Sequence, residues 1–458
     1  MTSPADPERR PVAPGGATKP FWLDAPPAVV PQSELPSQPD ARRIKVLHVI
    51  TRFWAGAGGN TLVSALGMDP ARYEIWIAGV EGGPLWERAE ASGIHTVQLR
   101  GFTEVIAPLA DIGVLFQLIG LIRRERFSVV HTHSSKAGVL GRFAAWLCHT
   151  PAIVHTFHGF SFHDHMSRTR RRLYLAMERF VQPMTDRVLT VAPAIAREAV
   201  EQRLGRPGSV WVVPSAIELD RVPVEGSLAI RDRLGLSAEA KIVGTVGRVD
   251  FQKAPLDFVR MASIVRAERP GTVFVMVGDG PMEEQAKREA DRTGVDVLFT
   301  GFRSDAAEIA SVFDVFVVSS LYEGLGRSLT EALASGRPVV ASAVNGVPDL
   351  VEPGATGLLA APHDPRALAM CVLWILDHPD EAARMGEQGR ARVRAQFRTE
   401  DMCSLIDATY RELLGLPAPV SSGGPRPSRG RNSGAGRGRS AVGSSRERSN
   451  PEVRSAHG

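Results

Sequence analysis

The stretch VFDVFVVSSLYEGLGRSLTEALASGRPVVAS, residues Val312 to Ser342, decides the fold of this chain. It contains an apolar strand, a glycine-containing turn, a helical segment and a second apolar strand, which is the pattern of a βαβ unit in a parallel sheet. Glu323 and Glu331 lie in the turn and the helix, and Gly324 and Gly326 follow the first glutamate. Two carboxylates after a buried strand indicate a site for a ligand with many hydroxyl groups.

The same alternation extends along the chain in both directions. Helical patterns, for example at 255–268 and 281–292, separate apolar runs that are typical of strands. These runs occur at 44–50, 73–80, 95–99, 128–133, 152–158, 187–192 and 210–214, and again at 241–247, 273–280, 297–301, 312–320, 338–342 and 357–360. The pattern predicts an α/β fold of two doubly wound Rossmann-like domains that face each other across a cleft, with ligands at the carboxyl ends of the strands.

Composition sets the expected boundaries. We expect Rossmann-like domains at 44–220 and 221–395, and a helix at 396–416 that packs back toward the first domain. Segment 1–43 is rich in Pro, Ala and Ser, and segment 417–458 is rich in Gly, Ser and Arg. Both segments are expected to be disordered. Residues 421–458 contain eight arginines and two glutamates, so +6 of charge lies there and about −2 is left for the remainder of the +4 chain.

This charge distribution makes nucleic acid an unexpected partner for the folded part. The basic tail either contacts RNA or acidic lipid, or only increases solubility.

Cys148, Cys371 and Cys403 lie far apart without the spacing of a disulfide framework or a zinc site, which favours a reducing, cytoplasmic compartment. The N-terminus lacks the apolar core of a signal peptide. The most apolar run, at 106–122, predicts a buried amphipathic helix, with an internal membrane span as the alternative.

Glycines follow the first predicted strand. Gly58 and Gly59 lie between that strand and a helical pattern, in TRFWAGAGGNTL. Glycine allows the backbone to approach a phosphate or a sugar closely, although a strand-to-helix turn also uses glycine for conformational reasons.

Histidines end two other predicted strands. His131 and His133 end one, and His155 and His158 end the next. They either offer hydrogen bonds and a proton in the cleft or have a structural role. Because alternate strand residues point to opposite faces, we expect at most one of each pair to face the ligand, and Gly159 favours His158. A metal site is not expected, since no adjacent carboxylate completes a ligand set.

Cations and an aromatic ring follow strands of the second half. Arg248 and Lys253 can together neutralise a diphosphate, or can be part of a solvated loop. Phe302 and Arg303 follow a later strand and suit a nucleobase. Backbone amides near the start of the helix that contains Glu331 form an anion site.

Four segments in the second half resemble a known family. In order they are GRVDFQKAP, VGDGP, TGFRSD and EGLGRSLTEALASGRPVVASAVNGVPDLVEPGATGLLAAPHDP, and they resemble the retaining glycosyltransferases of family 4, which have the GT-B fold. The resemblance covers about 241–365. From about Ile44 the resemblance is looser and rests on the glycine loop and on the segments VVHTHSSKAGVLGR and PAIVHTFHG. These two segments look most like those of family members that build polysaccharides on lipid-linked acceptors. The family usually has glycine where Ala254 follows Lys253.

The resemblance implies a retaining, metal-independent hexosyltransferase that uses a nucleotide-diphosphate sugar, with UDP favoured, and a glycan or lipid-linked acceptor in polysaccharide biosynthesis. The N-terminal domain would bind the acceptor and the C-terminal domain the donor, without a cofactor. The implied catalytic residues are Glu323, His158, Arg248 and Lys253. The implied donor-binding residues are Gly58, Gly59, Arg248, Lys253, Phe302, Arg303, Glu323, Gly324, Leu325, Gly326, Arg327, Ser328, Leu329 and Glu331.

Candidates for the acceptor side are His133, Lys136 and Arg168. Four arginines, Arg168 and residues 170–172, precede a helical pattern, with two phenylalanines upstream. They suit an anionic membrane surface or an acceptor phosphate, with a solvated helix start as the alternative. We therefore expect a cytoplasmic protein and hypothesise peripheral contact with the inner face of the cell membrane. The alternative functions are a nucleotide-sugar epimerase of the GT-B fold and a non-catalytic scaffold that binds a nucleotide sugar.

Overall fold

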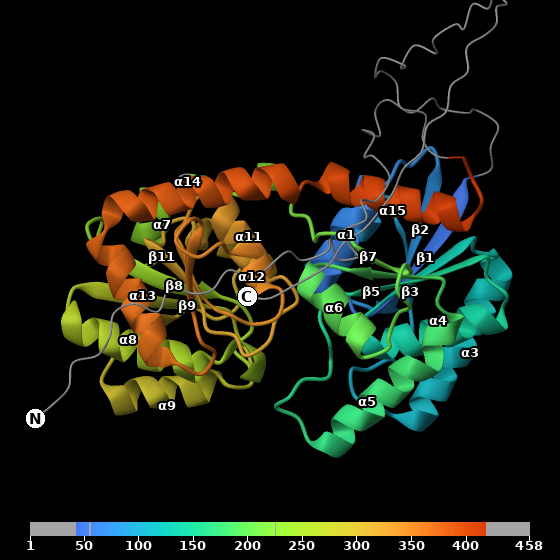
Figure 1. Ribbon diagram of the computed structural model, residues 1–458, viewed down its shortest axis with the longest axis horizontal. Coiled ribbons are helices and arrows are strands. Elements are labelled where there is room, and N and C mark those ends of the chain that lie inside the picture. Colours follow the sequence, from blue (N-terminus) through green and yellow to red (C-terminus); the bar gives the residue numbers. More distant parts are fainter. Residues whose placement is uncertain (1–42, 55, 225, 418–458) are drawn as a thin grey trace, which may run out of the picture. The chain divides into compact units, whose positions relative to one another are not determined.

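Two parallel sheets organise the protein (Figure 1). The computed structural model describes residues 43–54, 56–224 and 226–417. Within them, the first sheet has the strand order β3-β2-β1-β4-β5-β6-β7 and the second has the order β10-β9-β8-β11-β12-β13. The predicted fold class of two doubly wound domains is confirmed. Apart from Arg43 and Pro417, the segments expected to be disordered lie outside the described residues.

Every predicted strand is present. The first sheet contains β1 (Ile44–Arg52), β2 (Tyr73–Val80), β3 (His95–Gln98), β4 (Val129–His133), β5 (Ala152–Phe157), β6 (Arg187–Thr190) and β7 (Val210–Val212). The second contains β8 (Lys241–Val246), β9 (Thr272–Val277), β10 (Val297–Phe299), β11 (Val315–Val318), β12 (Val339–Ser342) and β13 (Gly357–Ala360). The central strands are rich in Val and Ile because helices cover both faces; all four residues of β11 are buried.

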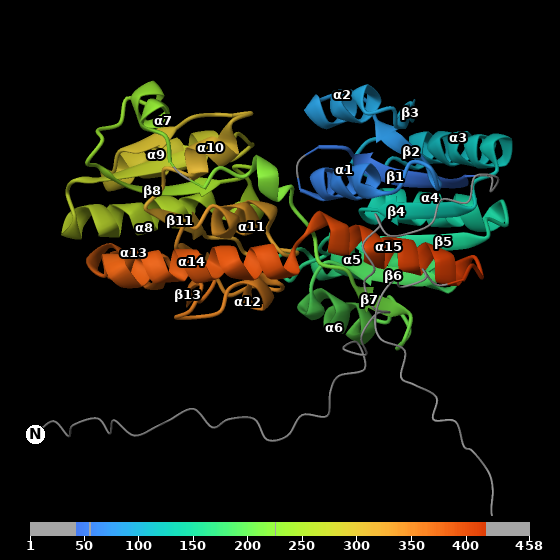
Figure 2. The same cartoon turned by 90° about the horizontal axis from the view of Figure 1, so that it is seen from above.

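The helices fill the crossovers between these strands. Around the first sheet they are α1 (Ala57–Gly67), α2 (Pro84–Ala91), α3 (Pro108–Glu125), α4 (Ser135–Leu147), α5 (Arg168–Val181) and α6 (Pro193–Glu201). Around the second they are α7 (Leu228–Arg233), α8 (Pro255–Glu268), α9 (Glu283–Thr293), α10 (Ala306–Ala310), α11 (Arg327–Ala334), α12 (Val347–Leu350), α13 (Pro365–Asp377) and α14 (Pro379–Gln396). Helix α8 packs against both α9 and α13 (Figure 2).

The strand order determines where a ligand can bind. In each sheet the chain winds outward from the centre in two directions, and the direction reverses between β1 and β4 and between β8 and β11. At such a switch point the following loops diverge to opposite faces and leave a crevice at the carboxyl ends of the strands. Candidates were predicted in the segments after β1 (Gly58 and Gly59), β8 (Arg248 and Lys253) and β11 (Glu323).

The last helix returns to the first sheet. Helix α15 (Thr399–Leu413) follows the second sheet in the sequence but packs on α1, where it is drawn in red beside blue (Figure 1). The Tyr73 hydroxyl donates to Asp407 at 2.6 Å, and the Tyr410 hydroxyl lies 2.6 Å from His131 Nδ1. Buried side chains of α15 are therefore hydrogen-bonded to residues of the first sheet and form part of its core.

Helix α3 differs from the expected buried helix. Val114, Leu118 and Leu121 are buried against the sheet, but Leu109 and Phe116 on the other side are 88% and 67% exposed. In the described part of the chain, no helix is both long and apolar enough to cross a bilayer. The run looks strongly apolar in the sequence because both faces of α3 carry apolar side chains. The rest of the protein covers only one of these faces.

Candidate active site

A cavity of about 680 Å³ lies at the carboxyl ends of strands from both sheets. This volume falls in the range of about 300–1,000 Å³ that is usual for small-molecule sites. Among its lining residues are most of the predicted catalytic and donor-binding positions: His158, Arg248, Lys253, Phe302, Arg303, Glu323, Gly324, Leu325, Gly326, Arg327, Ser328 and Glu331. The fold therefore brings segments more than 150 positions apart in the sequence to one cavity.

Lys253 and Glu323 form the charged centre of the cavity. The Lys253 ammonium contacts Glu323 Oε1, and the Ser320 hydroxyl donates to the same oxygen at 2.8 Å. Glu323 is buried, so this pairing offsets the cost of removing its carboxylate from water. Arg248 is half-exposed, and its guanidinium lies 3.3 Å from Asp250. Two cations, each paired with a carboxylate, thus line the cavity after β8 and β11.

A close approach of two backbones explains Gly324. A Cβ atom at this position would lie 1.7 Å from the carbonyl oxygen of His158. The carbonyl of Gly324 is itself so close to Gly346 that a Cβ there would lie 2.0 Å from it. Since no side chain fits at Gly324 or Gly346, Gly324 allows the loop after β11 to contact the loop after β5, and Gly346 allows the loop after β12 to contact the loop after β11. Glu323 and His158 consequently line the same cavity.

Helix α11 directs its N-terminus toward the cavity, which Gly326, Arg327 and Ser328 line. Unpaired backbone N–H groups at a helix N-terminus favour anions. Arg327 Nε donates to Glu331 Oε1 at 2.9 Å, while its Nη1 is buried with no hydrogen-bond partner in the described chain. Burial raises the pKa of Glu331, and the neighbouring guanidinium opposes that rise. An anionic ligand could accept a hydrogen bond from Nη1 of Arg327.

Aromatic rings from the loops after β1 and β10 line the cavity together. The rings of Trp54 and Phe302 have centroids 6.1 Å apart, and Phe302 is 53% exposed. Arg303 is held by two hydrogen bonds of 2.8 Å to Asp305. An exposed ring with a fixed guanidinium beside it provides stacking area for a flat heterocycle.

Several predicted residues lie outside the cavity lining. Gly58 and Gly59 are buried in the first turn of α1, and the backbone that lines the cavity there belongs to Gly56 and Ala57. The guanidinium of Arg327 lies 3.3 Å from the Cβ position of Gly59, so it occupies the space between that glycine and the cavity. Leu329 is fully buried in the core.

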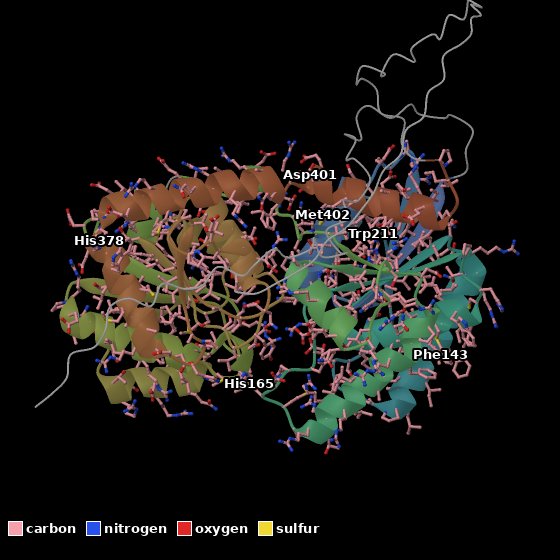
Figure 3. The ribbon with its side chains drawn as sticks, viewed as in Figure 1. Phe143, His165, Trp211, His378, Asp401 and Met402 are labelled. Atoms are coloured by element: carbon pink, nitrogen blue, oxygen red, sulfur yellow. The ribbon has the colours of Figure 1, made fainter. Side chains whose placement is uncertain are left out.

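The acceptor-side candidates also lie apart from the lining. His133 is buried behind His158, and Lys136 forms an ion pair with Asp111. Arg168 is exposed at the start of α5, whereas Arg171 of the same helix does line the cavity. His165, labelled in Figure 3, precedes this helix and contacts the Phe251 ring, with centroids 5.7 Å apart.

Neither His131 nor His133 lines the cavity, but the reason given for expecting at most one of them there, that they point to opposite faces, does not apply to this pair. His131 and His133 are two positions apart, so they point to the same face of β4, and their rings lie 4.4 Å apart. His155 lies on the opposite face, where its Nδ1 is 2.8 Å from the Thr132 hydroxyl. His48, in the middle of β1, was not predicted; it lies beside His131 and His133 because β1 and β4 are neighbours. His158 lines the cavity as predicted.

Other lining residues were missed as well. Asn345 accepts a hydrogen bond from the backbone N–H of Glu323 at 3.1 Å, and His163 stacks on Tyr322 with ring centroids 4.2 Å apart. Asn345 follows β12, so the rule that polar residues after strands mark the site could have found it. No sequence pattern predicted His163 and Tyr322, because their contact forms only when two loops meet in the fold.

Both halves of the chain match models of sugar-transferring proteins. Residues 227–392 match the family described as Glycosyl transferases group 1, and residues 61–216 match the one described as Glycosyl transferase 4-like domain. The D-inositol 3-phosphate glycosyltransferase of Thermobispora bispora is 30% identical over 400 residues, which is 82% of this chain and 88% of that protein. The chain belongs to the family 4 type of GT-B glycosyltransferases.

Other relatives of this glycosyltransferase span much of its length. The UDP-Gal:alpha-D-GlcNAc-diphosphoundecaprenol alpha-1,3-galactosyltransferase of Escherichia coli is 29% identical over 331 residues, 70% of this chain and 85% of the relative. Among solved structures, Anabaena HepE in complex with UDP and glucose has a TM-score of 0.70 at 20% identity, covering 81% of this chain and all of that one. The likeness to HepE concerns the fold.

Proposed function

We propose that this glycosyltransferase transfers a hexose from a UDP-sugar donor to a glycan or lipid-linked acceptor in polysaccharide biosynthesis. The transfer retains the configuration of the sugar and needs no metal. One observation carries the proposal: the cavity joins Arg248, Lys253, Glu323, Glu331 and the N-terminus of α11. The donor specificity is supported by the relatives, since the E. coli protein is named for UDP-Gal and HepE was solved with UDP and with UDP-glucose.

The proposed roles follow from charge and position. Breaking the bond between the sugar and the diphosphate leaves negative charge on the leaving phosphate. Arg248, Lys253 and the amides of α11 stabilise that charge from fixed positions, in the role that a metal ion has in other transferases. Arg327 Nη1 supplies a further donor.

Glu323 holds the sugar rather than attacking it. Its two ordered contacts both use Oε1, which leaves Oε2 to accept sugar hydroxyls. Glu331 accepts the ribose hydroxyls, and Phe302 stacks on the base. Because no carboxylate is assigned as nucleophile, retention requires the acceptor to attack from the face that the diphosphate leaves.

A panel of nucleotide sugars tests the function. Nucleotide release is measured for UDP-, GDP- and ADP-linked hexoses, with and without EDTA, for the wild type, for Glu323→Gln and for Glu284→Gln, an exposed control on α9. We expect release from a UDP-sugar that EDTA does not reduce, a loss of about 10²-fold or more for Glu323→Gln, and no loss for Glu284→Gln. Equal release by wild type and Glu323→Gln from every donor would overturn the assignment.

The alternatives give different products. An epimerase would return an isomeric sugar without consuming an acceptor, and a scaffold would bind UDP without turnover. With a small alcohol as the acceptor, the anomeric coupling of the product determines whether configuration is retained. An inverted product would exclude the proposed geometry of attack.

We further propose contact with an anionic membrane through the first domain. Arg168, Arg170 and Arg172 are exposed at the start of α5, and α3 exposes Leu109 and Phe116. Basic and apolar side chains together favour an anionic lipid surface. Flotation with vesicles that contain anionic lipid is expected to fall when the three arginines are replaced by glutamine. Flotation unchanged by these replacements would refute the contact.

A further inference from the structure

Three histidines form a hydrogen-bonded chain that ends at the cavity. His48 Nδ1 lies 2.9 Å from His133 Nε2, and His133 Nδ1 lies 3.0 Å from His158 Nε2. His48 and His133 are 1% and 2% exposed, whereas His158 is half-buried and lines the cavity. The chain therefore connects the interior of the first sheet with the proposed sugar site.

Burial keeps these rings neutral. It lowers the pKa of His48 to about 3 and that of His158 to about 4, and it lowers the pKa of His133 well below its usual value. A neutral imidazole has one donor and one acceptor nitrogen. Because His133 uses both nitrogens, it donates to one neighbour and accepts from the other. Only two arrangements follow: all three rings carry their proton on Nδ1, or all three carry it on Nε2.

The inner end of the chain distinguishes the two arrangements. His48 Nε2 is buried and has no hydrogen-bond partner among residues 43–417 that the structure describes. In the Nε2-protonated arrangement this atom would be a buried N–H without an acceptor, and in the other arrangement it would be an unused lone pair. Buried donors without partners are rarer in proteins than under-used acceptors. The Nδ1-protonated arrangement is therefore favoured.

We propose that His48 and His133 are positioning residues that hold His158 as its Nδ1–H tautomer, so that His158 donates a hydrogen bond to the donor sugar. The part of this inference that concerns the sugar rests on the proposed function. Proton transfer to solvent is not the role of the chain, because it ends inside the protein at His48.

The third buried imidazole on this face has different partners. His131 uses Nδ1 toward Tyr410 and Nε2 toward Thr156, and its ring lies against that of His133 with the two planes tilted by 32°. His48, His131 and His133 could converge on a metal ion only if these hydrogen bonds were exchanged for ligand bonds. His131 is therefore a matched control: it has the same strand, face and burial as His133 but is not a member of the chain.

Nitrogen NMR of the full-length protein labelled with [¹⁵N]histidine tests the tautomer without any sugar donor. Protonated and unprotonated ring nitrogens give separate signals, and those of His158 are assigned by their loss in His158→Gln. We expect Nδ1 to carry the proton in the wild type and in His131→Phe, and a mixture of tautomers in His133→Phe. A wild-type His158 protonated on Nε2, or an unaltered tautomer in His133→Phe, would overturn the proposal.

Kinetics tests the role at the sugar. For His133→Phe we expect kcat to fall about tenfold, as for the loss of one oriented hydrogen bond, with KM for the donor changed less than about threefold. His131→Phe should keep both constants within about threefold of the wild type. An equal loss of kcat in both variants would assign His133 to packing. Zinc bound stoichiometrically in the wild type and lost in His48→Leu would show instead that the nitrogens are metal ligands.

Discussion

At the scale of single residues, Gly324 tests whether the contact between the loops matters for activity. In Gly324→Ala the new methyl group would overlap the carbonyl of His158, so the loops must separate and move Glu323. We expect nucleotide release to fall about 10²-fold, the cost of displacing a positioned group by about an ångström. Gly271→Ala is the control, since nothing lies within 4 Å of its Cβ position. Wild-type activity in Gly324→Ala would contradict the assigned geometry.

Ala254 gives a prediction of the opposite sign. It follows Lys253 with φ of 46° and ψ of 59°, a left-handed conformation that costs a non-glycine residue about 1–2 kcal/mol. Glycine at this position relieves that strain but adds conformational freedom to the unfolded chain. We expect Ala254→Gly to raise the free energy of unfolding by about 0.5–1 kcal/mol in a denaturant titration. Destabilisation would mean that burial of the alanine methyl group outweighs the strain.

Individual residues also show what the sequence could and could not predict about the site. Arg248, Lys253 and Glu323 were predictable because each follows a strand, and strands of a parallel sheet end at the same edge. No sequence pattern pointed to His48, which lies within a strand and reaches the buried histidines only through the register of β1 with β4. Gly59 was assigned to the ligand because the sequence does not show that the Arg327 side chain would lie between them.

At the scale of elements, the contact between α1 and α15 can be measured. A Cβ on Gly67 would lie 2.4 Å from the Cys403 sulfur, so glycine is needed for the two helices to approach. We expect Gly67→Ala to destabilise the protein by about 1–3 kcal/mol. Cys403→Ala removes the sulfur and should recover part of this loss in the double variant. Purely additive effects in this double-mutant cycle would exclude the steric cause.

Elements were also the level at which the sequence was most informative. Apolar runs predicted the strands of both sheets. The signal is strongest for central strands such as β4 and β11, because a strand buried on two faces is apolar throughout. Helix α3 was harder to interpret, since its apolar composition does not tell which side the sheet covers. Its exposed Leu109 and Phe116 become evident only when the packing is known.

At the scale of the whole molecule, the buried histidines make stability depend on pH. The pKa of His48 is lowered to about 3 in the folded protein, so between that value and about 6.5 the unfolded chain binds a proton that the native state does not. Stability is thus lost as pH falls through this window, by about 2 kcal/mol at pH 5 for this one residue. We expect Tm to fall from pH 7 to pH 5, and less steeply in His48→Phe. Parallel curves would contradict this source of acid sensitivity.

The charge of the whole chain leads to a further prediction. Residues 421–458 carry +6, and the cavity-lining residues that the structure describes all lie before them. A chain ending at Pro417 should release nucleotide at about the wild-type rate, within twofold, because it keeps all the lining residues that the structure describes. It should also bind RNA and anionic vesicles less at low salt. A large loss of nucleotide release would assign the tail to the reaction.

The return of α15 to α1 has a consequence for synthesis on the ribosome. The first sheet is translated early, yet residues of α15 such as Cys403 and Tyr410 are part of its core. Translation adds about 5–20 residues per second, so the nascent first domain waits roughly ten seconds or more for its last helix. During that time the surface that α15 will cover is open to chaperones and to other nascent chains. A nascent chain stalled before Thr399 should therefore be more sensitive to protease in its first domain than the released protein.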